Sequence, residues 1–152
     1  MTNFSQHILV STDLSPASLL AIDAAATLAR AFGARVTLAH VFDPFPLTPT
    51  ATSQLTTSEQ LEVAQNYERH LQGELERVRD TRLAGIDAAV TLLRGRSAAE
   101  ELCRHAESAG VDLIVIATHG RTGLARMLIG SVAERVVRHA SCPVLTLRSK
   151  LD

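Results

Sequence analysis

The 152 residues suffice for one folded domain, 1–152, and leave little room for a second, because domains typically hold roughly 100–200 residues. Apolar residues make up 46% of the composition and charged residues 20%, which excludes a predominantly disordered chain. The formal net charge of -1 offers no excess of positive charge to attract nucleic acid or an anionic membrane surface.

The first elements follow a strand, loop, helix order. Residues 8–10 form a short apolar run that leads into a polar loop. Ser15 suits the N-cap of a helix and Pro16 its first position, so the sequence predicts a helix over 17–32, ended by Gly33. Residues 36–41 are almost wholly apolar, which is typical of a strand buried on both faces of a parallel sheet.

The middle of the chain contains a proline-rich segment and a long helix. Residues 44–53 carry three of the five prolines, a composition that predicts an exposed loop. Two interpretations remain for residues 48–57, a lid over a ligand or a variable insertion. A long surface helix is expected over 59–83, closing near Gly85, with an apolar stripe that includes Tyr67 and Leu71.

The second half of the chain continues the alternation. We expect a strand over 88–93, a helix to about 110, a strand over 113–117, a helix over 131–140 and a strand over 143–148. Two helices begin with the pattern of a capping box, in which Ser97 pairs with Glu100 and Ser131 pairs with Glu134. Alternating strands and helices predict an α/β fold: a single doubly wound, parallel, five-stranded sheet with helices on both faces.

The numbers of cysteines and lysines bear on the expected location of the protein and on how it could bind phosphate. Two cysteines and an N-terminus without a basic stretch before a long apolar run favour the cytoplasm, and no apolar run approaches the roughly 20 residues that span a bilayer. The one lysine, Lys150, lies near the C-terminus, which excludes lysine-dependent phosphate loops. A phosphate site here would use backbone amides, hydroxyls or arginines.

A glycine-bearing segment follows the fourth predicted strand. Ala117-Thr118-His119-Gly120 ends that strand, and Gly130-Ser131 opens the last helix. Glycine lets a phosphate approach the backbone, and the amides at the start of a helix attract anions. The segment therefore predicts a nucleotide phosphate site, although glycines in such turns also serve the turn alone.

This segment resembles the motif G-x2-G-x9-G-[ST] of the universal stress protein family, since it reads Ala117-x2-Gly120-x9-Gly130-Ser131. The similarity extends over nearly the whole chain and departs from the motif at its first glycine. It implies strand order 3-2-1-4-5 and usually a homodimer, with some members binding ATP and others not. We therefore expect a cytoplasmic stress-response protein that binds ATP, with Mg²⁺ bridging the phosphates and a regulatory output with at most slow hydrolysis.

The resemblance also implies roles for particular positions. Thr12 and Asp13 correspond to the acidic turn after the first strand, near adenine and ribose, and the backbone of Val41 to the group that reads the adenine edge. The remaining predicted ATP-binding residues surround the phosphates or begin the motif: Ala117, His119, Gly120, Gly130, Ser131 and Val132. The alternative is a nucleotide-free dimeric interaction module, in which Ala117 fills the adenosine pocket.

Several of these residues also have a structural interpretation. Ser131 either donates to a phosphate or caps the last helix, and Asp13 either accepts a ribose hydroxyl or bonds the amides of its own turn. His119 is expected to line the crevice rather than transfer protons. Arg121 and Arg126 either reach phosphate oxygens or remain solvated.

Two further expectations concern the C-terminal region. The cysteines, with His105 and His139, have poor spacing for zinc, and they lack the C-x-x-C arrangement of a redox pair, so we predict no metal site and unreactive thiols. The last strand would form an exposed sheet edge through Val144, Leu145 and Leu147. The resemblance implies that two such strands meet in a homodimer. Regulatory protein partners are not identifiable from the sequence.

Overall fold

The computed structural model describes residues 6–44, 54–119 and 129–148. The strands are β1 (His7–Ser11), β2 (Arg35–Phe42), β3 (Ala88–Arg94), β4 (Leu113–Ala117) and β5 (Val144–Leu147). The helices are α1 (Pro16–Phe32), α3 (Thr57–Arg82), α4 (Ala98–Ser108) and α5 (Ser131–His139). The proline-rich segment lies largely outside the described residues, as do Gly120, Arg121 and Arg126, so the predictions made for them are not addressed by the structure.

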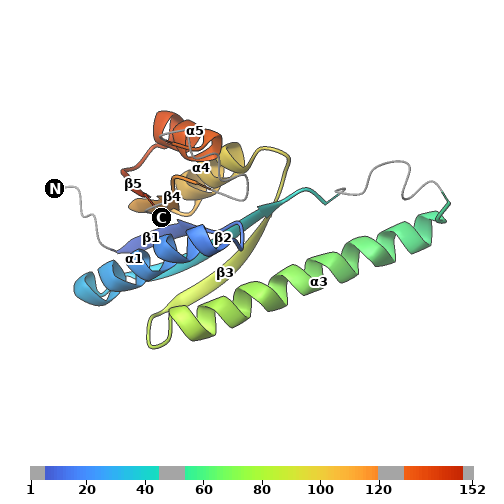
Figure 1. The fold of residues 1–152 in the computed structure, drawn as a ribbon, viewed down its shortest axis with the longest axis horizontal. Helices are drawn as coiled ribbons and strands as arrows, with labels where there is room; N and C mark the ends of the chain where they lie inside the picture. The colour runs from blue at the N-terminus through green and yellow to red at the C-terminus, as the bar shows by residue number, and fades with distance from the viewer. Residues whose placement is uncertain (1–5, 45–53, 120–128, 149–152) are drawn as a thin grey trace.

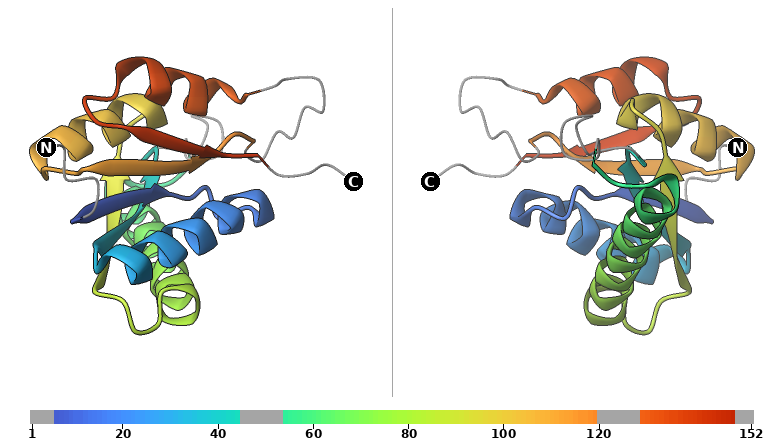
Figure 2. Two further views of the ribbon diagram at one scale, coloured as in Figure 1. Left: turned by 90° about the vertical axis from the view of Figure 1, so that its left-hand side faces the viewer. Right: turned by 90° about the vertical axis from the view of Figure 1, so that its right-hand side faces the viewer.

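The strands form one parallel sheet in the order β3-β2-β1-β4-β5, which confirms the predicted doubly wound α/β fold. Helices α1 and α3 cover one face, and α4 and α5 cover the other (Figure 1). The two views in Figure 2 show the sheet between these helical layers. Strand β1 lies at the centre, and the chain winds outward from it in both directions.

The core is divided by the sheet into two apolar clusters. Because side chains alternate along a strand, Ile8 and Val10 of β1 pack against α1, whereas Leu9 packs on the opposite side. Leu75 of α3 belongs to the first cluster and Leu102 of α4 to the second, and both are fully buried. Burial on both faces explains why the strands at the centre read as continuous apolar runs.

The observed ends of the helices match the predicted ends in part. Gly33 ends α1 with φ 68°, a left-handed conformation that glycine adopts without steric cost. Helix α3 begins two residues earlier than expected, because Thr56 and Glu59 form a reciprocal capping box. This pattern is present in the sequence as Thr56-Thr57-Ser58-Glu59 and could have located the helix start.

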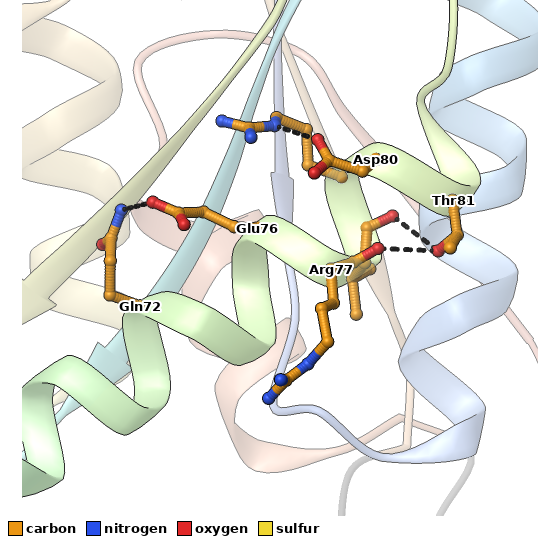
Figure 3. Close-up of polar contacts among 7 residues, drawn as sticks. Gln72, Glu76, Arg77, Asp80 and Thr81 are labelled. Atoms are coloured by element: carbon orange, nitrogen blue, oxygen red, sulfur yellow. Dashed lines mark hydrogen bonds and ion pairs between the residues drawn. The ribbon is translucent and has the colours of Figure 1, made fainter.

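Helix α3 presents a buried stripe to the sheet and a polar surface to solvent. Leu71 and Leu75 are buried, while Gln72 donates to Glu76 on the helix surface. The hydroxyl of Thr81 donates to two carbonyls of the preceding turn (Figure 3). Toward its N-terminus the helix extends past the sheet, and Leu61 there is 59% exposed (Figure 1).

Candidate functional site

A cavity of about 330 Å³ opens at the carboxyl ends of β1 and β4. These strands are neighbours in the sheet, and the direction of winding reverses between them, which is where doubly wound folds bind ligands. The predicted site residues that line the cavity are Thr12, Asp13, Val41, Ala117, His119, Gly130, Ser131 and Val132. The fold therefore brings together predicted residues from the first, second and fourth strand–helix units.

The loop after β1 forms one wall. The hydroxyl of Thr12 accepts from the Leu14 amide and lies 2.7 Å from the Ser18 hydroxyl. Because Ser18 donates to the Ser15 carbonyl, Thr12 is the donor in the Thr12–Ser18 bond. Leu14 has φ 63°, a conformation that is uncommon outside glycine. Thus the Thr12 hydroxyl holds this strained loop in place. Both hydrogen bonds of the hydroxyl are made to other groups of the protein, Ser18 and the Leu14 amide.

The structure shows the turn interpretation of Asp13, and the ribose interpretation stays a prediction. Its carboxylate accepts a hydrogen bond from the Ser15 amide at 2.9 Å and another from the Ser15 hydroxyl. Ser15 occupies the N-cap position of α1, yet its hydroxyl makes no bond to the helix, so the expected side-chain cap is wrong. Asp13 is a turn-forming residue and also part of the cavity wall.

His40 is a cavity residue that the sequence reasoning missed. Its side chain is 8% exposed, and Nδ1 lies 2.8 Å from the Thr12 carbonyl oxygen. A carbonyl only accepts, so Nδ1 carries the proton and donates. A histidine within the largely apolar run 36–41 was the available signal. The other cavity residues not predicted are Ser11, Ser18, Ala98, Ile116, Thr118 and Ala133.

Gly130 joins the end of β4 to the start of α5 through a close backbone contact. Its amide donates to the Thr118 carbonyl, and a Cβ atom placed on Gly130 would meet that oxygen at 2.5 Å. The φ of Gly130 is -69°, which any residue adopts, so proximity and not conformation requires glycine here. The contact fixes the first turn of α5 beside the cavity.

The capping box predicted for Ser131 is wrong. Gly130 is the N-cap residue of α5, and Ser131 is the first residue inside the helix. The Glu134 amide donates to the Gly130 carbonyl in an ordinary helical bond. Consequently the Ser131 hydroxyl does not cap this helix, and it lies in the cavity wall. At α4, by contrast, the serine half of the predicted capping box is present, since the hydroxyl of Ser97 accepts from the Glu100 amide, while the Glu100 carboxylate pairs with Arg135.

Two helix N-termini meet at the cavity. Ala98 and Ser131 are the first residues of α4 and α5, and both line it. Arg135 of α5 pairs with Glu100 in the first turn of α4 at 3.2 Å and connects the two helices. Unpaired amides and helix dipoles at such termini favour a negatively charged ligand.

The side chains at the end of β4 are close-packed. Thr118 and His119 are 5% and 8% exposed, and the Thr118 hydroxyl lies 3.0 Å from Nδ1 of His119. Ala117 is the last residue of β4 and also lines the cavity. The cavity persists with the Ala117 methyl group in its wall.

The two cysteines are not among the residues that line this cavity, and both pack against the second core cluster, Cys103 from α4. Burial raises the pKa of the Cys103 thiol, and burial together with the neighbouring Cys103 raises that of Cys142. Both thiols therefore stay protonated at neutral pH. Within the described ranges, no three His, Cys, Asp or Glu side chains gather as a metal site, and no helix is long and apolar enough to cross a membrane.

The sequence of this chain is similar to those of known proteins. The chain is 37% identical over 149 residues to universal stress protein MJ0531 of Methanocaldococcus jannaschii, an alignment that covers 96% of this chain and 84% of the relative. It is 32% identical over 149 residues to universal stress protein YxiE of Bacillus subtilis, covering 93% and 97%.

The fold is also similar to solved structures. Protein MJ0577 superposes with a TM-score of 0.81 at 25% identity, covering 98% of this chain and 99% of the other. A universal stress protein from Burkholderia pseudomallei superposes with a TM-score of 0.68 at 31% identity, covering 97% and 98%. The model of the universal stress protein family matches residues 5–148. This chain therefore belongs to the universal stress protein family.

Proposed function

We propose that this protein binds ATP in the cavity between β1 and β4. The observation that carries the proposal is the convergence of two walls of complementary chemistry. One wall, from β1 and β2, contains Asp13 and Val41, which suit a nucleoside. The other contains the first turns of α4 and α5, whose amides suit phosphates.

Three structures with the same fold support an adenine nucleotide as the ligand. They are universal stress proteins solved with cAMP, with dAMP from Archaeoglobus fulgidus, and with AMP from Arabidopsis thaliana, at 24%, 22% and 18% identity. Their ligands share the adenine base and differ in the sugar and phosphate. ATP, as the ligand of this chain, extends the same recognition to a triphosphate.

We also propose that Mg²⁺ bridges the phosphates of the bound ATP. Asp13 is a carboxylate in the cavity wall, but the described residues do not gather three metal-ligating side chains there. Mg²⁺ commonly retains water and substrate phosphates as ligands, which fits such a sparse protein contribution. The ion would then arrive with the nucleotide.

The proposed output is regulatory, in the cytoplasm and as a homodimer. Strand β5 lies at one edge of the sheet, with Val144, Leu145 and Leu147 only partly covered, so a second copy has an edge on which to pair. Light scattering at micromolar concentration is expected to give the mass of a dimer. ATP hydrolysis is expected to remain below about 1 s⁻¹, the lower end of ordinary enzymes.

The direct test is to denature freshly purified protein, quantify released nucleotide by chromatography, and titrate the emptied protein with ATP and Mg²⁺ by calorimetry. Stoichiometric release or saturable binding is expected. If no nucleotide is released and no binding heat is seen at millimolar ATP, the result favours the nucleotide-free interaction module. The specific argument for that module is Ala117, which stands in place of the motif's glycine.

Ala117→Gly is the variant that separates these two functions. If Ala117 blocks the site, the variant gains nucleotide binding that the parent lacks. If the parent binds ATP, the variant is expected to bind similarly. Substitution of Gly130 does not separate them, because an added Cβ disturbs the Thr118 contact whether or not a ligand is present.

A further inference from the structure

We infer that His40 is a positioning residue for the nucleotide base, acting by ending the β1–β2 hydrogen-bond ladder one step early. The identity of the ligand rests on the proposed function, and the early end of the ladder rests on the backbone geometry of β1 and β2. Neither the sequence motif nor the predicted site residues include His40.

The ladder between β1 and β2 follows a regular alternation. The Arg35 amide donates to the Gln6 carbonyl, and the Thr12 amide donates to the Ala39 carbonyl. Val36 instead bonds toward β3, through its amide and the Asp87 carbonyl. Odd-numbered residues of β2 therefore direct their N–H and C=O groups toward β1, and even-numbered residues direct theirs toward β3.

Val41 is the next odd-numbered residue. In a continued parallel ladder its amide would donate to the Thr12 carbonyl. Strand β1 ends at Ser11, however, and among the described residues the Thr12 carbonyl accepts from Nδ1 of His40, not from the Val41 amide. The Thr12 carbonyl thus bonds the side chain of His40 in place of the next backbone amide of the ladder.

The consequence is a donor and an acceptor exposed side by side at the cavity. The N–H and C=O of Val41 face the β1 side, beyond the last paired residue, and Val41 lines the cavity. An adjacent N–H and C=O match the adenine edge, which offers a ring-nitrogen acceptor beside an amino donor. Hypoxanthine presents the reverse pattern, so the same pair disfavours it.

His40 is well held for this role. The side chain is 8% exposed, and it shares its face of β2 with the core residues Val36 and Leu38. The Thr12 carbonyl belongs to the loop that the Thr12–Ser18 hydroxyl bond anchors to α1. The end of β1 is therefore held to β2 by the Thr12 amide bond to Ala39 and by His40, and it is held to α1 by the Thr12–Ser18 bond.

The test compares His40→Phe with His40→Asn by amide hydrogen exchange and calorimetry. Phenylalanine keeps a ring and removes the donor, whereas the amide nitrogen of asparagine occupies the position of Nδ1 and keeps it. In the parent and in His40→Asn the Val41 amide is expected to exchange rapidly, while the Ala39 amide is protected. In His40→Phe the Val41 amide is expected to become protected, as it pairs with the released Thr12 carbonyl.

Binding supplies the second readout. His40→Phe is expected to lose about tenfold or more in ATP affinity and to lose the preference for ATP over ITP, while His40→Asn retains both. A protected Val41 amide in the free parent overturns the inference, and so does parental ATP affinity in His40→Phe. A parent that binds no nucleotide overturns the proposed function and with it the ligand role of His40, while the exchange pattern separately decides the ladder geometry.

Discussion

Nearly buried histidines lie at both ends of the parallel sheet, and His7 at the amino end and His40 at the carboxyl end make different contacts. At the amino end, Nε2 of His7 lies 2.8 Å from the Thr37 hydroxyl and Nδ1 lies 3.1 Å from the Arg35 guanidinium. Arginine only donates, so Nδ1 of His7 accepts and Nε2 donates. The carboxylate of Asp112 accepts from the backbone amides of Gln6 and His7.

At the carboxyl end the polar groups surround a cavity. His40 bonds the Thr12 carbonyl, the backbone of Val41 stays outside the ladder, and the first turns of α4 and α5 point inward. The amino end satisfies its polar groups within the protein and so fixes where β1 begins. The carboxyl end leaves the Val41 backbone outside the ladder beside a cavity, and this difference supports the proposal that the carboxyl end binds the ligand.

The largest effect is expected from Gly130→Ala, which breaks the β4–α5 junction at the carboxyl end. The added methyl would overlap the Thr118 carbonyl, so the first turn of α5 must move. We expect a loss of about 1–3 kcal/mol in the free energy of unfolding and loss of ATP binding. Urea denaturation and calorimetry measure the two effects.

Gly73→Ala is the matched control, since nothing lies within 4 Å of a Cβ at this helical position. It is expected to stabilise the protein by about 0.5–1 kcal/mol and to leave ATP binding unchanged. Equal effects of the two substitutions would show that Gly130 has no special contact.

Acid is expected to weaken the amino end. Burial, followed by the charge of Arg35, lowers the pKa of His7 below its ordinary value of 6.5. The unfolded chain therefore binds a proton more readily than the folded one, and the stabilisation from neutral His7 is complete above pH 6.5 and is lost as the pH falls below it. Urea midpoints measured between pH 8 and pH 5 test this.

His7→Gln is expected to reduce that acid sensitivity, whereas the same change at the exposed His139 leaves it intact. Parallel pH profiles for the parent and His7→Gln would contradict the assigned role of His7. Aspartates and glutamates that do not interact with His7 contribute equally to both profiles and cancel in the comparison.

A smaller and more selective effect is expected from Ser131→Ala. Because Gly130 is the N-cap of α5, removal of the hydroxyl is expected to change the free energy of unfolding by less than about 0.5 kcal/mol, and to lower ATP affinity severalfold. Ser97→Ala, which removes a side-chain cap from α4, is expected to cost about 1 kcal/mol. A similar loss of stability in Ser131→Ala and Ser97→Ala would show that the Ser131 hydroxyl does cap α5.

The smallest effect concerns the cysteines. Their raised pKa values predict slow alkylation at neutral pH compared with the unfolded chain. Because both lie outside the cavity lining, ATP is expected to leave the alkylation rate unchanged. Strong protection by ATP would place the ligand beside Cys103 and Cys142 instead.

Local patterns predicted the elements of the described fold, because each strand and helix has its own periodicity and its own turn residues. The start of α3 was missed although its capping box is local, so this error was avoidable. Ser131 was misassigned because Ser-x-x-Glu fits a capping box wherever it occurs. Contact between Gly130 and the Thr118 carbonyl sets the helix start, and this contact depends on how β4 meets α5.

The site was predictable where it depends on a motif and not where it depends on pairing between strands. Gly130 and Ser131 carry a recognisable spacing, and the structure places both at the cavity. The role of His40 follows from where β1 stops beside β2, which no window of the sequence contains.

Backbone amide NMR on ¹⁵N-labelled protein titrated with ATP and Mg²⁺ tests the central claim most directly. Saturable shifts are expected at Thr12, Val41 and residues 130–132, at the carboxyl end, with His7 and Arg35 at the amino end unchanged. Shifts centred on the amino end, or no shifts at millimolar ATP, would contradict the assignment of the carboxyl end as the nucleotide site.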